Sequence, residues 1–256
     1  MNIATWNVNS LNVRLTHLIK WLQETPVDVL ALQELKLNQD QFPRETLLAS
    51  GYQAVWFGQK TYNGVALLAK SPIVPTDVTF GIPGYEDPQR RVIAATIEGI
   101  RFISVYCVNG ESLMSEKFRY KLTWFEALLG YIQTALAQYP LLVVMGDFNI
   151  APQAIDTYDP LLWQNRVICS KEERELFQRL LSYGLYDSLR TLYPDQALYS
   201  WWDYRAGMFR HNYGLRIDHI LVSHALWPRV TKGAVDAVPR GWERPSDHTP
   251  VMLALK

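Results

Sequence analysis

The sequence has few cysteines, no excess charge of either sign and no long apolar run. Of its 256 residues only Cys107 and Cys169 are cysteines, too few for a disulfide scaffold or a thiolate zinc cluster. No apolar stretch approaches the roughly 20 residues of a membrane span, and residues 1–10 lack the pattern of a secretory signal. We therefore expect a cytoplasmic protein with no membrane attachment.

The charge is balanced, with 25 lysines and arginines against 25 aspartates and glutamates. Nucleic-acid-binding proteins often carry a basic surface, so the balance at first argues against a polyanionic partner. Apolar residues make up 48% of the chain, which excludes a disordered polymer. Because no linker, repeat or low-complexity tract interrupts the sequence, we predict one domain over residues 1–256.

Short apolar segments rich in β-branched and aromatic residues predict buried strands. These segments are residues 3–8, 27–32, 65–68, 92–97, 102–108, 141–145, 217–222 and 251–253. Helical spacing of apolar residues predicts helices near 15–22 and over 115–138, and Ser170 with Glu173 has the spacing of a capping box. Gly99 separates two strand segments as a hairpin turn would. The predicted class is mixed α/β with some antiparallel pairing.

Polar side chains stand at the ends of most predicted strands. They include Asn7, Asn9, Gln33, Glu34, Tyr106, Asn109, Asp147, Asn149, Asp218, Ser246, Asp247 and His248. If the strands align in sheets, their ends meet at one rim, where α/β proteins usually bind ligands. Carboxylate and amide oxygens suit Mg²⁺ or Mn²⁺, and Mg²⁺ needs few protein ligands because it shares substrate phosphates. Glu34 and Asp247 are candidate ligands.

Asp147 fits either an ordinary turn residue before Phe148 or a site residue. Gly146 before it and Asn149 two residues on favour a site that holds a water and its target phosphate together. His248 follows Asp247, and an imidazole beside a carboxylate can be fixed in one tautomer and kept partly protonated. Asp218 lies in a buried strand and needs a partner. We therefore predict a hydrogen bond between Asp218 and His248.

Six motifs occur in order along the chain. They are TWNVNS (5–10), LQELK (32–36), YNGV (62–65), VMGDFN (144–149), LRID (215–218) and RPSDH (244–248). Single motifs of this set are shared with DNase I-like nucleases and with lipid and inositol phosphatases. The ordered set, with Asp-Tyr-Arg at 203–205, closely resembles the exonuclease III and AP endonuclease family, within the endonuclease/exonuclease/phosphatase superfamily, over residues 1–253.

The resemblance implies a four-layer α/β sandwich of the DNase I type. Two mixed β-sheets would pack face to face with helices on the outside, leaving a cleft at the strand ends. It also implies a Mg²⁺ cofactor, with Mn²⁺ as a substitute. The metal site would be built on Asn7, Glu34 and Asp247, and the candidate ligands are Asn7, Glu34, Asp147, Asn149, Asp247 and His248.

The same resemblance implies catalytic roles. Asp147 would orient or deprotonate the attacking water, and Asn149 would hold that water and the phosphate. Tyr106 would contact the scissile phosphate or help the leaving group. His248, paired with Asp218, would stabilise the pentacovalent state. Such roles suit phosphodiester hydrolysis, which depends on positioning the water and on neutralising developing charge.

On the substrate side the resemblance places Trp201, Leu215 and Ile217 around a pocket for a base-free deoxyribose. AP endonucleases of the human type usually have an aromatic residue where this chain has Leu215, a departure that weakens the predicted grip on an abasic sugar. Further candidate contacts with DNA are Asn9, Lys36, Arg90, Arg91, Asn109, Lys117 and Arg205, together with the loops 151–170 and 207–214.

We therefore predict a metal-dependent DNA repair nuclease. It would act as a monomer on double-stranded DNA with abasic sites, nicks or recessed 3' ends, as a 3' to 5' exonuclease, an AP endonuclease cutting 5' to abasic sites, or both, with possible 3'-phosphatase activity. One alternative is a phosphatase or phosphodiesterase with a non-DNA substrate, against which the 203–205 motif argues. Another is a non-catalytic DNA-binding relative, against which the intact set of acids and His248 argues.

The balanced charge is compatible with this function. Assigning Glu34, Asp147, Asp218 and Asp247 to a metal cleft leaves 25 basic against 21 acidic residues elsewhere. We expect a modestly positive surface around an acidic site, with DNA affinity that falls less steeply with salt than that of a strongly basic protein.

Overall fold

Twelve strands form two six-stranded sheets in the computed structural model, which describes residues 1–256. The strands are β1 (Asn2–Asn7), β2 (Val29–Gln33), β3 (Tyr52–Phe57), β4 (Val65–Lys70), β5 (Thr76–Phe80), β6 (Val92–Ile97), β7 (Ile100–Tyr106), β8 (Leu142–Asp147), β9 (Leu185–Asp187), β10 (Asp218–Ser223), β11 (Val230–Val235) and β12 (Val251–Leu255). One sheet has the order β11-β12-β1-β2-β4-β3 and the other the order β5-β6-β7-β8-β10-β9. Both sheets are mixed, because β1 with β2 and β7 with β8 are parallel and the remaining pairs are antiparallel.

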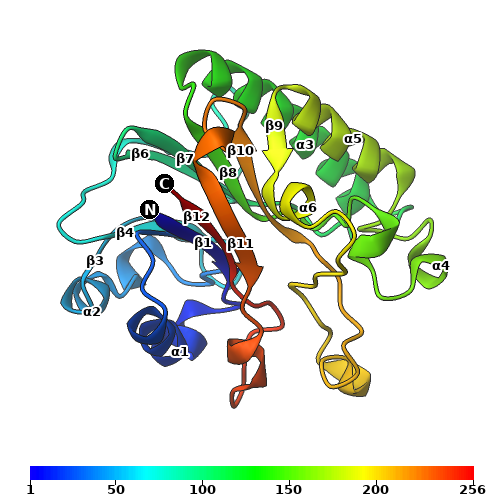
Figure 1. Cartoon of the computed structure of the whole chain (residues 1–256), viewed down its shortest axis with the longest axis horizontal. Coiled ribbons are helices and arrows are strands. Elements are labelled where there is room, and N and C mark those ends of the chain that lie inside the picture. Colours follow the sequence, from blue (N-terminus) through cyan, green and yellow to red (C-terminus); the bar gives the residue numbers. More distant parts are fainter.

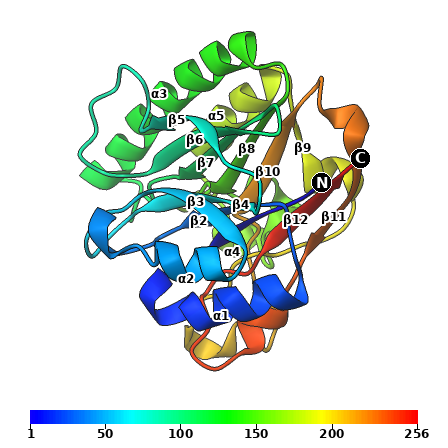
Figure 2. The same ribbon diagram turned by 90° about the vertical axis from the view of Figure 1, so that its left-hand side faces the viewer.

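Helices cover the outer face of each sheet (Figures 1 and 2). The α-helices are α1 (Leu11–Glu24), α2 (Arg44–Ala49), α3 (Glu116–Gln138), α4 (Pro160–Trp163), α5 (Lys171–Ser182) and α6 (Ser188–Leu192). Short 3₁₀ turns lie at Gln39–Gln41, Ala154–Asp156, Arg205–Gly207, Trp227–Arg229 and Val238–Gly241. Figure 2 shows α3 and α5 on one side of the two sheets and α1 and α2 on the other. None of the helices combines the length and apolarity required to cross a membrane.

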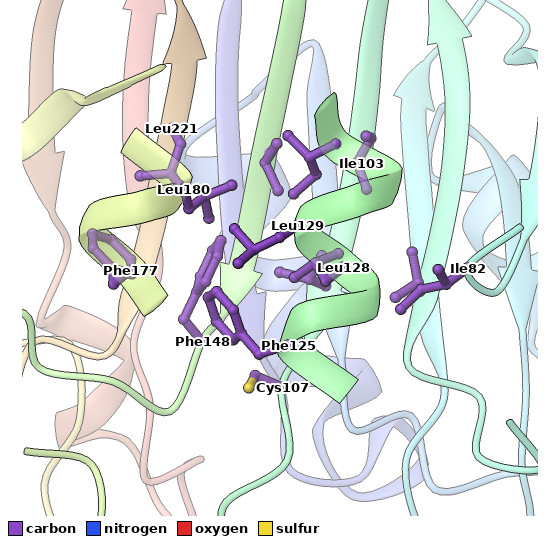
Figure 3. Close-up of a cluster of buried hydrophobic side chains, with 14 of the residues drawn as sticks. Ile82, Ile103, Cys107, Phe125, Leu128, Leu129, Phe148, Phe177, Leu180 and Leu221 are labelled. Atoms are coloured by element: carbon purple, nitrogen blue, oxygen red, sulfur yellow. The ribbon is translucent and has the colours of Figure 1, made fainter. Parts of the chain in front are cut away.

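Three apolar clusters hold these layers together. Residues such as Val29 from one sheet and Met145 from the other form the cluster between the sheets. Phe125 and Leu129 of α3 pack with Phe177 of α5 on the outer face of the second sheet (Figure 3). A third cluster lies under α1 and α2. Two sheets face to face between two helical layers confirm the predicted four-layer sandwich.

The predicted strands are all present, but the sequence pattern does not predict β3, β5, β9 or β11. These four strands are the outer edges of the two sheets. Edge strands are half-exposed, and β5 has no fully buried residue, so they lack the continuous apolar run of a central strand. The hairpin at Gly99 is confirmed: Glu98 and Gly99 both have positive φ, as the turn between β6 and β7 requires.

Candidate active site

The strand register brings the polar strand ends together. Asp147 at the end of β8 lies beside Tyr106 of β7 and Asp218 of β10. In the other sheet Asn7 pairs with Gln33, so Glu34 follows directly at the same edge. Because the sheets pack face to face, these two groups of side chains meet. The convergence expected from the sequence is present.

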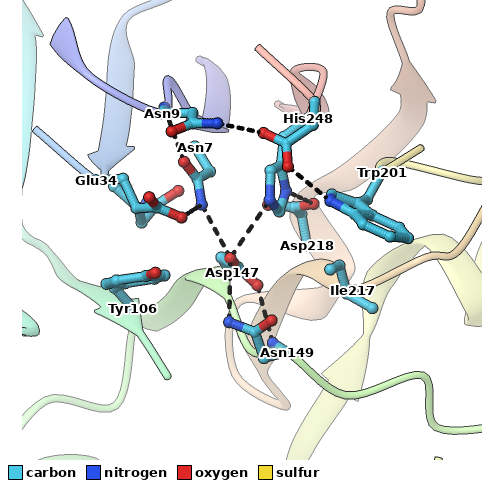
Figure 4. A network of polar contacts seen from close by, with 12 residues as sticks. Asn7, Asn9, Glu34, Tyr106, Asp147, Asn149, Trp201, Ile217, Asp218 and His248 are labelled. Atoms are coloured by element: carbon cyan, nitrogen blue, oxygen red, sulfur yellow. Dashed lines mark hydrogen bonds and ion pairs between the residues drawn. The ribbon is translucent and has the colours of Figure 1, made fainter. Parts of the chain in front are cut away.

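Asp147 is the centre of a hydrogen-bond network (Figure 4). The amide nitrogen of Asn7 donates to Glu34 Oε1 at 2.8 Å and to Asp147 Oδ2 at 2.9 Å, and the backbone N–H of Asn149 donates to Asp147 Oδ1 at 2.9 Å. Gly146 is required before Asp147, because a Cβ there would lie 1.9 Å from the Val105 carbonyl oxygen. Burial raises the pKa of Asp147, which makes this carboxylate a stronger base than a surface aspartate.

His248 forms the predicted hydrogen bond with Asp218. Its Nδ1 lies 2.8 Å from Asp218 Oδ2, which also accepts from Ser200 Oγ at 2.6 Å, and its Nε2 lies 3.6 Å from Asp147 Oδ2. Burial opposes a charge on the ring, but the Asp218 and Asp147 carboxylates outweigh it and raise the pKa of His248 to about 10. The ring is therefore an imidazolium cation at neutral pH.

Tyr106 lies beside the carboxylates with its ring against Arg91. Burial, reinforced by Glu34 and Asp147, raises the pKa of Tyr106 well above its usual range, so the hydroxyl remains a donor. The Arg91 guanidinium lies 4.8 Å from the Tyr106 ring centroid and donates to the Tyr106 carbonyl and to Gln89. Arg91, predicted to contact DNA, is 5% exposed in the structure and packs against Tyr106.

Several residues of this edge have left-handed backbone conformations. Asn9, Glu34, Lys36 and Asn149 all have φ between 44° and 54°. Such conformations are uncommon for residues with a Cβ, and they concentrate where surrounding bonds and functional constraints hold them.

The donor set suits a divalent cation. Ligand atoms of Glu34, Asp147 and His248 lie within 4.8 Å of one another. The Glu34 and Asp147 carboxylates converge on a single donor, the Asn7 amide, whereas His248 Nδ1 is engaged by Asp218. Two hard oxygen ligands around one point are what Mg²⁺ or Mn²⁺ requires from a protein that shares it with a phosphate.

Asp247 lies outside that cluster. Its carboxylate accepts from Asn9 Nδ2 at 2.8 Å and from the Trp201 indole at 2.9 Å. The Lys36 ammonium connects the two groups, because it donates to Asn9 Oδ1 at 2.6 Å and pairs with Glu34 Oε2 at 2.8 Å. Lys36 and Asn9 thus lie at the rim of the site, where the sequence predicted substrate contacts.

The predicted sugar pocket is filled by apolar side chains. Leu215 and Ile217 are each only 1% exposed and pack with Ala151, Ile168 and Cys169, while Trp201 packs partly buried against this cluster. The three residues expected around the sugar pocket thus lie together, with Leu215 and Ile217 almost without exposed surface in this conformation. The pairing that buries them, Leu215 with Trp201, joins segments that the sequence pattern does not link.

Comparison with known proteins agrees with these observations. Residues 4–248 match the endonuclease/exonuclease/phosphatase family. Exodeoxyribonuclease III of Haemophilus influenzae is 36% identical over 269 residues, covering 100% of both chains. The chain belongs to this family, in its exonuclease III branch.

The structure of the 3'-5' exonuclease NExo from Neisseria meningitidis is 53% identical, with a TM-score of 0.98 over 100% of both chains. A structure of the 3' phosphatase NExo from Neisseria, bound to a product DNA hairpin, is 52% identical, with a TM-score of 0.98 over 100% of this chain and 99% of that one.

Sequence reasoning missed two groups around the site. The first is Ser200, whose hydroxyl donates a hydrogen bond to Asp218 Oδ2. Ser200 lies in the segment from Tyr199 to Trp202, which has no recognisable catalytic motif. The second group is the buried network of Arg216 with Asp156 and Asp187. Arg216 donates from Nε to Asp156 at 2.7 Å and forms two bonds of 2.9 and 2.8 Å with Asp187, connecting the loop after β8 to β9. A single arginine between Leu215 and Ile217 gave no signal of this role.

Replacing Arg216 by methionine is expected to lower the free energy of unfolding by about 3–5 kcal/mol, because Asp187 then has no guanidinium partner and Asp156 keeps only that of Arg190. Burial alone would raise the pKa of both Asp156 and Asp187, but Arg216 and neighbouring cationic groups outweigh it and lower both values. The stabilisation is therefore present above about pH 4 and lost on further acidification. Urea unfolding should show a large difference between wild type and variant at pH 7 that narrows at about pH 3. A constant difference would contradict this.

Proposed function

We propose that the chain is a metal-dependent phosphodiesterase of DNA repair that removes nucleotides or phosphate from the 3' ends of double-stranded DNA, acting as a single catalytic domain and as a monomer. The observation that carries the proposal is the network centred on Asp147, in a chain similar over its full length to a 3'-5' exonuclease and 3' phosphatase. In-line hydrolysis needs a base to activate the water and positive charge near the phosphate. This network supplies a carboxylate for the first and the His248 ring for the second.

Asp147 is the proposed general base. Its carboxylate has the raised pKa that favours proton abstraction, and Asn149 is bonded to it through the backbone N–H. The side chain of Asn149 accepts from Asn109 Nδ2 at 3.2 Å. The two amides thus form a short row beside Asp147 that can hold the water and the phosphate oxygens in line.

His248 and Tyr106 are the proposed donors to the phosphate. The imidazolium, kept charged by Asp218, carries a proton on Nε2 next to Asp147, and a protonated Tyr106 hydroxyl lies beside the same carboxylate. Both would strengthen their bonds as negative charge grows on the phosphate oxygens in the transition state. Trp201, Asn9 and Lys36 at the rim would contact the DNA strand.

Glu34 and Asp147, with Asn7 between them, are the residues proposed to hold Mg²⁺. Asp247 lies farther out at the rim, where its carboxylate accepts a hydrogen bond from Asn9. A bound divalent ion would supply charge neutralisation at the scissile phosphate. Asn149 and His248 neighbour this site, but their hydrogen bonds suit substrate better than metal.

Removal of divalent cations by EDTA is expected to abolish hydrolysis, and added Mg²⁺ or Mn²⁺ to restore it. Glu34→Gln should raise the Mg²⁺ concentration for half-maximal rate about tenfold or more, because a neutral amide is a weaker ligand. The exposed Glu126→Gln variant serves as the control and should leave the metal requirement unchanged. Full activity in EDTA would contradict the metal assignment.

The preference for strand ends is tested by comparing three duplexes in Mg²⁺. They carry a 3' phosphate at a nick, a recessed 3' hydroxyl end, or an internal abasic analogue. Because Leu215 and Ile217 close the sugar pocket, we expect both 3' ends to be processed much faster than the internal abasic site. Faster cleavage 5' to the abasic analogue would establish an AP endonuclease instead. No reaction with any duplex would overturn the nuclease proposal.

A further inference from the structure

Lys121 lies on the inner face of α3, outside the network described above, yet its ammonium group reaches the loops that carry two site residues. Nζ donates to the backbone carbonyl of Asn109 at 3.1 Å and to that of Asn149 at 2.7 Å. Its third bond goes to the carboxylate of Glu173 on α5. An ammonium group has three donors, so every donor of Lys121 is used.

This ion pair is fully enclosed, with the Lys121 and Glu173 side chains 1% and 0% exposed. Buried charges persist only when paired and hydrogen-bonded, and replacement of such a pair by apolar groups often costs little. Glu173 also accepts from the backbone N–H groups of Ile168 and Ser170 at 2.9 and 3.0 Å. The pair therefore joins three segments: the loop after β7, the loop after β8 and the start of α5.

The loop after β8 has a particular need for this support. Asn149 has a left-handed backbone with φ 49°, its N–H is bonded to Asp147, and its side chain donates to the Cys107 carbonyl at 3.0 Å. With the N–H held by Asp147 and the carbonyl held by Lys121, an uncommon backbone conformation is restrained at both ends. The Asn109 carbonyl is held by the same ammonium group, so the two asparagine amides keep a fixed separation.

We propose that Lys121, neutralised by Glu173, is a positioning residue that sets the Asn109 and Asn149 amides for catalysis. The inference rests on the proposed function, since those amides matter only if the site hydrolyses phosphate esters. A second ion pair between the same helices, Arg179 with Glu126, is exposed and contacts neither loop. It therefore provides a matched control for the link between α3 and α5.

The test uses the full chain and a duplex with a 3' phosphate. The double variant Lys121→Met/Glu173→Gln removes the ammonium group without leaving a buried charge unpaired, so it is preferred to Lys121→Met alone, which could unfold. We expect kcat to fall about tenfold to a hundredfold, the cost of small misplacements of reacting groups, while KM stays within about threefold. Arg179→Met should leave kcat unchanged.

Leu129→Ala separates positioning from general loss of stability, because it opens a cavity in the α3 and α5 core without removing a hydrogen bond to the Asn109 or Asn149 backbone. We expect this variant to lose at least as much thermal stability as the double variant, yet to keep kcat within about twofold of wild type. A folded double variant with wild-type kcat, or an equal fall of kcat in Leu129→Ala, would overturn the proposal. An inactive wild-type enzyme would instead overturn the proposed function.

Discussion

The Asp147→Asn variant is expected to hydrolyse a 3' phosphate duplex about 10³-fold or more slowly than wild type. The substitution is nearly isosteric but removes the proposed base and one of the two carboxylates proposed to hold the metal. It should not unfold the protein, because burial raises the pKa of Asp147 and so makes the charged form costly to the folded state. Single-turnover rates and thermal unfolding measured on the same preparation check both parts.

A matched control for this variant is Asp195→Asn, which makes the same change at an exposed position outside the site. It should retain wild-type rates. If Asp147→Asn kept its rate on all three duplexes, the assigned site would be wrong. If it lost rate only in proportion to a fall in its melting temperature, Asp147 would be a structural residue rather than the base.

The second large effect is expected for His248→Ala. Loss of the imidazolium should lower kcat about 10²- to 10⁴-fold, because its charge meets the phosphate most strongly in the transition state. The dissociation constant for DNA should change by less than about threefold, since few phosphate contacts are lost. Rates measured under saturating DNA give kcat, and equilibrium binding with Ca²⁺ in place of Mg²⁺ gives the dissociation constant. Equal losses in both would make His248 a binding residue.

The partner of His248 provides a pH test of the same assignment. Asp218 is the carboxylate that contributes most to the raised pKa of His248, so Asp218→Asn should lower that pKa. A group with a raised pKa is protonated below it and loses its proton as the pH rises through it. The decline of activity at alkaline pH should therefore begin at a lower pH in Asp218→Asn than in wild type. An unchanged alkaline limb would argue against an imidazolium donor.

Central strands and the strand-end residues could be read from the sequence because both have strong local signals. The buried strands have continuous apolar runs, and the polar residues Asn7, Glu34 and Asp147 end them abruptly. The hydrogen bond between Asp218 and His248 followed from a buried acid that needed a partner. Edge strands such as β5 were not predicted. β5 is largely exposed and its pairing with β6 shifts register, so its sequence has no regular alternation of apolar and polar residues.

Which of the strand-end residues contact one another is known only from the tertiary structure. Asn7 and Asp147 are 140 positions apart, and only the packing of two sheets brings their side chains to 2.9 Å. Asp247 lies apart from the carboxylate cluster, bonded to Asn9 and Trp201, and Leu215 is buried against Ala151, Ile168 and Cys169 from distant loops. None of these outcomes has a local cause, so no local pattern could indicate them.

Glu173 illustrates the division between the two levels. Its place in a capping box with Ser170 follows from spacing, since residues three apart at a helix start are neighbours in any chain. Its second role, to neutralise Lys121 beneath Asn109 and Asn149, depends on α3 packing against α5. The family, the central strands and the polar residues at their ends could all be predicted from local sequence patterns. The fold decided the contacts among those groups, because long-range packing alone sets their distances, burial and charge.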